Sequence, residues 1–475
     1  MDNSIVARSF SQHWRKKMRR GAFFGGLVLG FFICIYFTPY QGPLPFELSP
    51  PTPIDYFSIK FLSVYLIDVC ILFFSGHSYR MRRVNSIFYV TTPVKSRIVC
   101  NFTEPESDFC EMHGDIRILG NSSTIFFPHF SVADMFTKNN WPRIKPYARK
   151  TDEGALERVR QFRFSQEMPR CTQNHRVPAI LFSIGGYTGN YYHSFSDVVI
   201  PLYTTSRKFN GQVQFLLADM KVFWTAKFQV VLKKLSNYEA IDIDKEEGVH
   251  CFPSMIIGLK KYKELSIDPL TSPDYSVTNF REFLRSSYYL KREYAIRLGS
   301  KEKRRPRMLI ISRTRTRKLM NEHELVTMAQ KLGFDVVLAE ASSNISEFSQ
   351  LVNSCDVLMG VHGAGLTNIV FLPNNAVFIQ VLPIPFGDIE WIARTTFGDP
   401  SKTMNLRYLE YKISEKESSL IQKYPLDHEV FKNPPLVAQK GWSYFKSIYL
   451  ENQNLKLDVL RFKTTLLEAL QMLSM

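Results

Sequence analysis

A histidine and an aspartate one helical turn apart form the clearest acid–base pair in the sequence. His193 and Asp197 lie in the segment Asn190-Tyr-Tyr-His-Ser-Phe-Ser-Asp197, directly after the glycine-rich turn at residues 185–190. Residues four apart share one face of a helix. An imidazole or carboxylate presented in this way can take a proton from a hydroxyl group as a general base. The alternative is that the pair caps the helix and has a buried structural role.

A glycine-rich loop with one histidine is the second candidate for chemistry. The loop His362-Gly-Ala-Gly-Leu-Thr-Asn368 follows an apolar run at residues 357–361. Glycine lets the backbone approach a ligand closely, and a helix is expected to begin near Leu366 or Thr367. The free N–H groups at such a helix start favour a phosphate. His362 can donate to a phosphate oxygen or contact a sugar, or it is a satisfied core residue beside a tight turn.

Alternating arginines form the third candidate. The segment Ser312-Arg-Thr-Arg-Thr-Arg-Lys318 follows the apolar run Met308-Leu-Ile-Ile. In an extended loop, Arg313 and Arg317 share a face, and arginine binds phosphate through two parallel hydrogen bonds. The alternative is a solvated basic loop.

Two further patterns favour other chemistries only weakly. Asp242-Ile-Asp244 has the spacing of carboxylates that hold a divalent metal on a nucleotide sugar. The pattern is short and arises often by chance, so we expect no metal site and no required cofactor. His-Gly-Ala-Gly is similar to the oxyanion loop of lipases, but the sequence has no G-x-S-x-G elbow, which argues against serine hydrolysis.

The elements around these residues alternate between strands and helices in two blocks. The first block has expected strands at 178–184 and 214–218, with helices at 192–208 and 227–235 and a charged helical stretch at 268–300. The second block has expected strands at 308–311, 335–338, 357–361 and 376–381, helices at 321–331 and 345–353, and a closing helix at 456–473. This alternation predicts an α/β fold with parallel sheets, in which ligands bind beyond the carboxyl ends of the strands.

The N-terminus has the features of a membrane anchor. Residues 1–20 form a basic tail, and residues 21–38 are uncharged and mostly apolar, long enough for one helix across a bilayer. The basic flank is expected to stay cytosolic, so the rest of the chain is lumenal. A cleaved signal peptide is the alternative, but no small-residue cleavage site follows. Residues 39–95 are then a stem that begins with a Pro-rich stretch.

A second apolar segment, at residues 57–75, complicates this topology. If it spanned the membrane, the catalytic region would face the cytosol. Asp68 lies near its centre, and a central aspartate costs about 2.5–3.5 kcal/mol on membrane insertion. The segment is therefore read as part of the stem.

Sequons and cysteines also favour the lumen. The sequons begin at Asn101, Asn121 and Asn344. Cys100 and Cys110 enclose a short segment of the kind that a disulfide closes, and Cys171 and Cys251 can form a second pair. Cys355 is expected to be a buried free thiol; the alternative is that all are reduced core cysteines.

The formal net charge of +16 first suggests a nucleic-acid partner. No zinc spacing, RNP-like motif or recognition-helix pattern accompanies the charge, and part of it lies in the N-terminal tail. We therefore expect no nucleic-acid partner; an anionic sugar donor fits better.

Three segments together resemble glycosyltransferase family 61. They are GNYYHSFSDVVIPLY, ISRTRTRKLMNE and DVLMGVHGAGLTNIVFLPNNAVFIQV, and the similarity extends over residues 98–475. GDIEWIARTTFGDPSKTMNLRYLEYKI and KNPPLVAQKGWSYFKSIYLENQN are similar to the plant branch of the family that decorates xylan. The apolar segment at 57–75 departs from the stem expected of the family.

The resemblance implies an inverting Golgi enzyme of the GT-B type, with an acceptor-side lobe at residues 96–300 facing a nucleotide-sugar lobe at residues 301–475. Asp197 would be the base, with His193 as the alternative, and Glu340 would bind ribose or uracil. The other residues of the UDP site would be Arg313, Arg317, His362, Gly363, Ala364, Gly365 and Asn368.

The expected reaction is transfer of arabinofuranose from UDP-arabinofuranose to O3 of a backbone xylose in xylan or arabinoxylan. Transfer of β-1,2-xylose from UDP-xylose is the alternative within the same branch. A non-catalytic Golgi scaffold is the alternative from another class. The sequence does not predict the oligomeric state.

Overall fold

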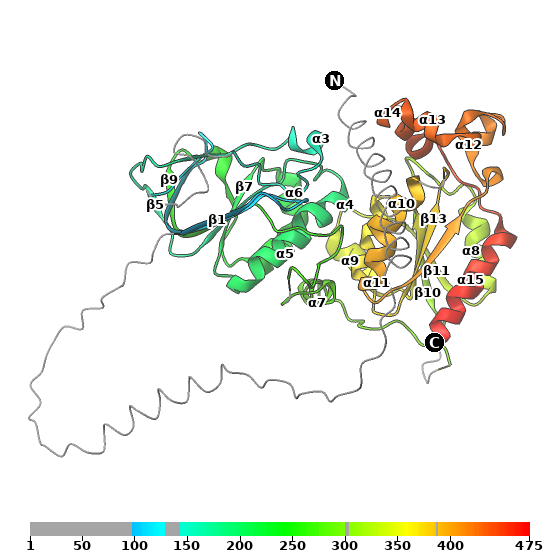
Figure 1. The fold of residues 1–475 in the computed structure, drawn as a ribbon. Coiled ribbons are helices and arrows are strands. Elements are labelled where there is room, and N and C mark those ends of the chain that lie inside the picture. The colour runs from blue at the N-terminus through cyan, green and yellow to red at the C-terminus, as the bar shows by residue number, and fades with distance from the viewer. Residues whose placement is uncertain (1–96, 129–142, 273, 300–303, 386–387) are drawn as a thin grey trace, which may run out of the picture. The chain divides into compact units, whose positions relative to one another are not determined.

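The computed structural model describes residues 97–128, 143–272, 274–299, 304–385 and 388–475 (Figure 1). The predicted tail, anchor, stem and apolar segment 57–75 lie outside these residues. Within the described ranges, no helix combines the length and apolar character needed to cross a membrane.

The first sheet is mixed, and the prediction of a parallel sheet is wrong for part of it. Its strand order is β4-β3-β2-β9-β6-β7-β8, with β1 on β2 and β5 on β9. Strands β9, β6, β7 and β8 are parallel, whereas β2 is antiparallel to β1, β3 and β9. The chain from β1 to β3 turns back through short connections, which only antiparallel strands allow. The strands are β1 (Arg97–Asn101), β2 (Phe109–Leu119), β3 (Thr124–Phe126), β4 (Arg163–Ser165), β5 (Gln173–Asn174), β6 (Ala179–Ser183), β7 (Gln214–Ala218), β8 (Ile241–Asp242) and β9 (Val249–Ile257).

The helix predicted after β6 exists but contains a π-helical segment. The chain runs through α4 (Tyr191–His193), the π-helix η1 (Ser194–Val199) and α5 (Ile200–Ser206). Short π-helical turns inside helices occur frequently at functional sites. This one contains Asp197.

The remaining helices of the first block are α3 (Glu153–Leu156), η2 (Arg207–Phe209), α6 (Val222–Leu235), η3 (Ile243–Lys245) and α7 (Val277–Ser287). Of the described residues in the stretch 268–300, which was expected to be helical, only those of α7 form a helix. Ser276 and Asn279 form a capping box that fixes its start.

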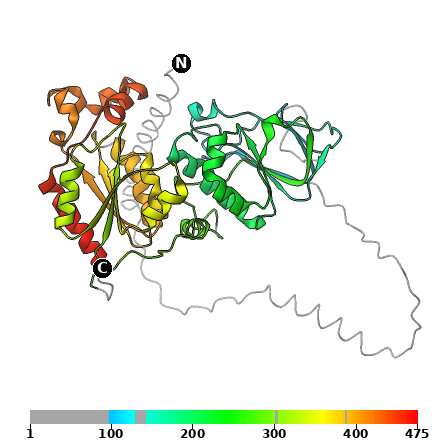
Figure 2. The ribbon, with the colours of Figure 1, turned by 180° about the vertical axis from the view of Figure 1, so that it is seen from behind.

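The second sheet is wholly parallel, as predicted, with the order β11-β10-β12-β13-β14 (Figures 1 and 2). The strands are β10 (Arg307–Ser312), β11 (Asp335–Glu340), β12 (Val357–Val361), β13 (Val377–Leu382) and β14 (Arg407–Lys412). The helices between them are α8 (Glu322–Lys331), α9 (Ile345–Asn353), the 3-10 helix η4 (Ala364–Phe371), α10 (Asp388–Ala393), the π-helix η5 (Arg394–Gly398) and α11 (Asp399–Thr403). Short elements η6 (Glu415–Glu417), η7 (Ser419–Gln422), α12 (Glu429–Lys432), α13 (Pro434–Gln439), α14 (Trp442–Phe445) and η8 (Lys446–Glu451) lead to the closing helix α15 (Val459–Ser474).

Alternate side chains of the second sheet pack on opposite faces. Met308 and Ile310 belong to the core cluster that also contains residues of α8 and α15. Leu309 and Ile311 belong to the cluster formed with α9 and η4. This second cluster continues into the first block through Phe195 on η1, so apolar packing joins the two sheets' helices.

In each sheet the strand order changes direction at one point, called here a switch point. In the first sheet it lies between β6 and β9, because the chain passes outward from β6 to β7 and β8 and then crosses back to β9. In the second it lies between β10 and β12, because β10 leads to β11 on one side and β12 to β13 on the other. Ligands of open α/β sheets bind at such switch points, beyond the carboxyl ends of the strands. His193 follows β6, and His362 follows β12.

Candidate active site

Asp197 is the centre of a buried charge network at the first switch point. It is fully buried. Arg149 donates to both of its carboxylate oxygens, from Nε at 2.9 Å and from Nη2 at 2.8 Å. The Tyr147 hydroxyl donates to Oδ2 at 2.9 Å, and Lys261 Nζ donates to Oδ1 at 3.1 Å.

This environment favours the alternative that the sequence offered, in which His193 rather than Asp197 is the general base. Burial by itself raises the pKa of a carboxyl group, but Arg149 and Lys261 outweigh it and hold the pKa of Asp197 well below its usual range. Such a carboxylate binds a proton poorly, and its oxygens already accept hydrogen bonds. We therefore assign Asp197 a positioning role.

His193 is placed to accept a proton, whereas Asp197 is not. Its Nδ1 lies 2.9 Å from Asp197 Oδ2, and the ionised carboxylate can only accept, so Nδ1 carries the proton. The lone pair is then on Nε2, for which the described residues provide no hydrogen-bond partner. The His193 side chain is 22% exposed, so a substrate hydroxyl can reach it.

Glu264 is the second carboxylate of the charge network around Asp197. It accepts from Tyr192 at 2.9 Å and Ser196 at 2.6 Å and pairs with both Arg149 and Lys261. Burial opposes its ionisation, but Lys261 and Arg149 lower the pKa of Glu264 to about 2. Lys261 and Glu264 lie in the loop after β9, so the two strands at the switch point supply the network together.

A glycine and a tyrosine set the turn beside His193. A Cβ atom on Gly186 would lie 2.2 Å from the Tyr147 ring, so only glycine allows this packing. The ring of Tyr187 lies 5.1 Å from the His193 ring, between centroids, and its hydroxyl donates to Asp152 at 3.0 Å. A sugar hydroxyl bonded to His193 would therefore lie close to the Tyr187 ring.

At the second switch point, two arginines converge on Gly363. A Cβ atom on this residue would lie 2.8 Å from Arg313 Nη1 and 3.3 Å from Arg317 Nη1, and its φ is +152°. Arg317 Nη1 donates to the His362 carbonyl at 2.8 Å. Arg313 Nε donates to the Thr316 carbonyl at 2.7 Å. The expectation that Arg313 and Arg317 share a face thus agrees with their placement.

Neither arginine forms an ion pair with a described residue, and Arg317 Nε is buried without a hydrogen-bond partner. The charges of Glu340 and Glu451 act on Arg313 and Arg317, respectively, but do not pair with them. Burial, and then the charge of Arg313, lower the pKa of Arg317 to about 9. Burial, and then the charges of Arg317 and Arg313, lower the pKa of His362 to about 3. An anion would relieve this unbalanced positive charge.

The remaining donor-side residues surround the same loop. Glu340 ends β11 and accepts from the Thr314 hydroxyl at 2.8 Å. Ala364 and Gly365 begin η4, which starts earlier than expected and is a 3-10 helix. Asn368 Nδ2 donates to the Gly365 carbonyl at 2.8 Å.

Two contacts bring the switch points together. The Tyr191 hydroxyl of α4 donates to Asn368 Oδ1 at 3.3 Å. The ring of Phe397 lies 5.4 Å from Tyr192 and 5.8 Å from His362, between centroids. The candidate base and the candidate anion site therefore belong to one packed region.

Comparison with known proteins identifies the family. The family model described as Glycosyltransferase 61 matches residues 191–379. The β-1,2-xylosyltransferase XYXT1 of Oryza sativa subsp. japonica is 41% identical over 79% of this chain and 84% of its own length. The chain belongs to glycosyltransferase family 61.

Two other relatives have names that refer to related activities. The α-1,3-arabinosyltransferase XAT3 of Oryza sativa subsp. japonica is 47% identical over 80% of this chain. The match spans 66% of the length of that relative. The xylan glycosyltransferase MUCI21 of Arabidopsis thaliana is 37% identical over 80% of this chain and 80% of its own length.

In this family 61 chain, Asp242 and Asp244 have structural partners. Asp242 pairs with Lys245 at 2.7 Å, and Asp244 accepts from the Asp219 backbone N–H at 2.6 Å. Arg160 Nε also lies 3.1 Å from Asp244 Oδ1. Over the described part of the chain, no group of three or more His, Cys, Asp or Glu side chains could hold a metal ion.

The cysteine pairs suggested by the sequence are bonded in the structure. Disulfides join Cys100 to Cys110 and Cys171 to Cys251, and Cys355 is a buried free thiol. Of the sequon asparagines, Asn121 and Asn344 are exposed and Asn101 is half-buried.

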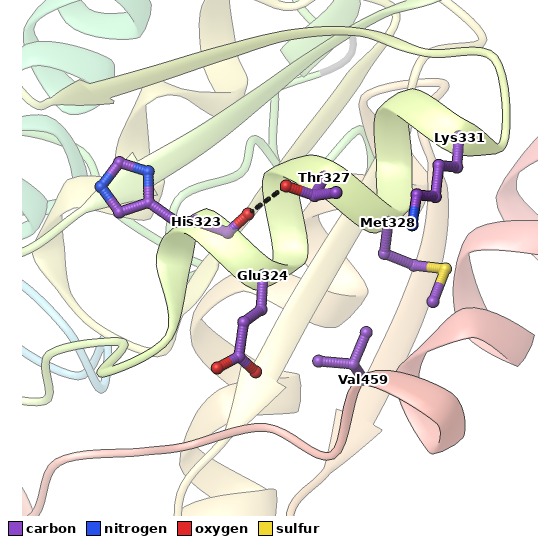
Figure 3. A pocket seen from close by; sticks show the side chains of 6 residues that line it. All are labelled: His323, Glu324, Thr327, Met328, Lys331 and Val459. Atoms are coloured by element: carbon purple, nitrogen blue, oxygen red, sulfur yellow. Dashed lines mark hydrogen bonds between the residues drawn. The ribbon is translucent and has the colours of Figure 1, made fainter.

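A surface pocket of about 460 Å³ lies between α8 and α15 (Figure 3). Its lining residues are His323, Glu324, Thr327, Met328, Lys331 and Val459. None of the predicted site residues of the family 61 chain lines it, so this pocket is separate from the candidate site.

Sequence reasoning missed the partners of Asp197 and of His362. Arg149 and Lys261 lie 48 and 64 residues from Asp197. The sequence held one indication for Lys261. It follows β9, which lies in the same sheet as β6, the strand before His193. Gln380, which contacts His362, was also detectable, as the polar residue within the apolar strand Val377–Leu382.

Proposed function

We propose that this chain is an inverting glycosyltransferase of the GT-B type that adds α-1,3-linked arabinofuranose from UDP-arabinofuranose to the xylan backbone. One observation carries the proposal: an imidazole whose Nε2 has no described hydrogen-bond partner lies in the same packed region as two arginines that form no ion pair with a described residue. The names of the rice and Arabidopsis relatives support the pentose and the xylan acceptor.

The geometry fits a single displacement at the anomeric carbon. The acceptor oxygen of a backbone xylose forms the new bond to that carbon while His193 Nε2 takes the hydroxyl proton. The bond from the anomeric carbon to the donor phosphate oxygen breaks, and its electron pair leaves with UDP. One in-line displacement inverts the configuration at this carbon.

The second switch point would stabilise the departing UDP. Arg313 and Arg317 carry positive charge toward Gly363, where the backbone allows a phosphate close approach. In other transferases, a divalent cation supplies this positive charge. Glu340, at the end of β11, would bind ribose or uracil.

We also propose a Golgi location, with residues 21–38 as the anchor of a single-pass type II protein and the catalytic region in the lumen. Two disulfides within the described residues support an oxidising compartment. A mobility shift after enzymatic deglycosylation would support lumenal exposure of Asn101, Asn121 and Asn344. Absence of a shift would favour the cytosolic arrangement.

Transfer of β-1,2-xylose from UDP-xylose is the second candidate. The name of XYXT1, whose length the chain matches more completely than that of XAT3, favours it. The two donors differ only in pentose form and hydroxyl placement, which a hydrogen-bonding site distinguishes well.

The test is incubation of the purified full-length chain with xylohexaose and either donor, followed by mass and linkage analysis. A pentose added from UDP-arabinofuranose alone would support the main proposal. A pentose added from UDP-xylose alone would replace it with the second candidate. No product from either, with UDP still bound, would point to another acceptor; no UDP binding would favour the non-catalytic scaffold.

A further inference from the structure

Gln380 is a fully buried polar residue in the middle of an apolar strand. It lies on β13, opposite Gly360 on β12 and Glu410 on β14. Every other residue of β13 is hydrophobic and buried. Burying an amide costs free energy unless the amide is hydrogen-bonded. The hydrogen-bond partners of Gln380 therefore indicate why this strand contains a glutamine.

A hydrogen-bonded chain runs from β14 through Gln380 to His362. The Tyr408 hydroxyl donates to Gln380 Oε1 at 2.7 Å. Gln380 Nε2 lies 2.8 Å from His362 Nδ1. Because the amide oxygen accepts from the tyrosine, the amide N–H₂ group faces the histidine, and an amide nitrogen can only donate. His362 Nδ1 must therefore accept, which leaves the ring proton on Nε2.

We propose that Gln380 and Tyr408 are positioning residues that hold His362 in the Nε2–H tautomer, so that this N–H donates to a phosphate oxygen of the nucleotide. The inference rests on the proposed function, because the nucleotide is the donor's leaving group. The ring then acts as a neutral donor beside two arginines. It does not act as a second base.

The surroundings of His362 favour this neutral form. Arg313 and Arg317, from the loop after β10, oppose a further positive charge. From β14, the Tyr408 hydroxyl lies 2.7 Å from Gln380 Oε1 and 3.1 Å from Glu410 Oε1, and the shorter contact is the one to Gln380. Glu410 is also paired with Arg394 at 3.0 Å. From η5, Phe397 presents an aromatic ring. No described carboxylate forms a hydrogen bond with His362, in contrast to His193.

Gln380→Glu is the variant that should reverse the tautomer. A carboxylate at this position accepts from Nδ1–H, which moves the lone pair to Nε2 and removes the donor near neutral pH. At acid pH either the imidazole or the new carboxyl group binds a proton, and the Nε2–H donor returns. UDP binding by Gln380→Glu should therefore be about tenfold weaker than wild type at pH 8 and recover toward pH 5.5.

The experiment is calorimetric titration of the full-length protein with UDP between about pH 5.5 and pH 8, where the imidazole and carboxyl groups of interest change charge. The matched control is Gln214→Glu, because Gln214 is also a buried glutamine on a strand but lies in the other sheet. We expect its UDP affinity to follow wild type. A Gln380→Glu affinity that equals wild type, or is weaker by the same factor at every pH, would overturn the proposal.

Nitrogen NMR of histidine-labelled protein tests the tautomer even if the glutamate variant does not fold. The His362 signals, assigned by their loss in His362→Gln, should show a protonated Nε2 and an unprotonated Nδ1 in wild type. The opposite pattern would overturn the proposal. Failure of the wild-type protein to bind UDP, with the expected NMR pattern, would overturn the proposed function and with it the phosphate contact.

Discussion

The two switch points each hold a histidine, and they differ in what surrounds it. At the first, Asp197 and Glu264 are balanced by Arg149 and Lys261, and the carboxylate orients His193. At the second, Arg313 and Arg317 have no acidic partner among the described residues, and an amide orients His362. A carboxylate leaves a lone pair on Nε2, whereas an amide N–H leaves a proton there. Under the proposed function, the same side chain would act as a base at the first switch point and as a hydrogen-bond donor at the second.

Removal of His193 should have the largest effect. In His193→Gln, we expect turnover to fall by about 10²–10⁴-fold, the usual contribution of general base catalysis. UDP affinity should not change, because His193 belongs to the acceptor side. His323→Gln, an exposed histidine on α8, is the control. Undiminished turnover in His193→Gln would show that His193 is not the general base.

Lys261→Met tests whether the first switch point is a structural charge network. The substitution leaves Asp197 and Glu264 with one cation fewer in a buried site, which should lower the free energy of unfolding by about 3–5 kcal/mol. The Lys261 side chain is 1% exposed, whereas that of Lys263 is 54% exposed. Denaturant unfolding of Lys263→Met should show a loss of less than about 1 kcal/mol. Equal losses in the two variants would contradict the buried network.

Arg317→Gln tests the unpaired charge of the second switch point. UDP affinity should fall by about 10–100-fold, because a charged hydrogen bond to phosphate is lost. Arg315, in the same loop, is exposed, so Arg315→Gln should bind UDP nearly as wild type does. An equal loss in both variants would mean that the loop acts through its net charge alone.

The buried neutral His362 should make stability depend on pH. Its pKa in the folded protein is about 3 against an ordinary 6.5, so between these values the unfolded chain binds a proton that the folded chain does not. Stability should therefore fall as pH falls below about 6.5, by about 1.4 kcal/mol per pH unit for this group. The difference in unfolding free energy between wild type and His362→Gln, measured from pH 7 to pH 5, isolates this slope. A difference that stays constant with pH would contradict a neutral His362.

Chelation should have the smallest effect. Asp242 and Asp244 already pair with Lys245 and the Asp219 backbone, and the arginines at Gly363 supply positive charge. We expect unchanged product formation in excess chelator. A loss that added magnesium or manganese restores would show that the carboxylates exchange these partners for a metal.

The sequence by itself determined strands β10 to β13 of the second sheet and the loops that carry the candidate donor residues, whereas β14 was not predicted. Runs of apolar residues at strand length, separated by amphipathic helices, encode a parallel sheet locally. The glycines around Ala364 and the arginines after β10 were visible because each group is contiguous in the chain, although only the fold brings Arg313 and Arg317 to Gly363.

Only the tertiary structure distinguishes His193 from Asp197 as the candidate base. Spacing places both side chains on one helix face, but the charge state of Asp197 depends on Arg149 and Lys261, which are distant in sequence. The same holds for His362, whose proton position depends on a glutamine one strand away and a tyrosine beyond it. Local patterns specify secondary structure, whereas the pKa and tautomer of a buried group depend on the partners that folding brings within hydrogen-bond distance.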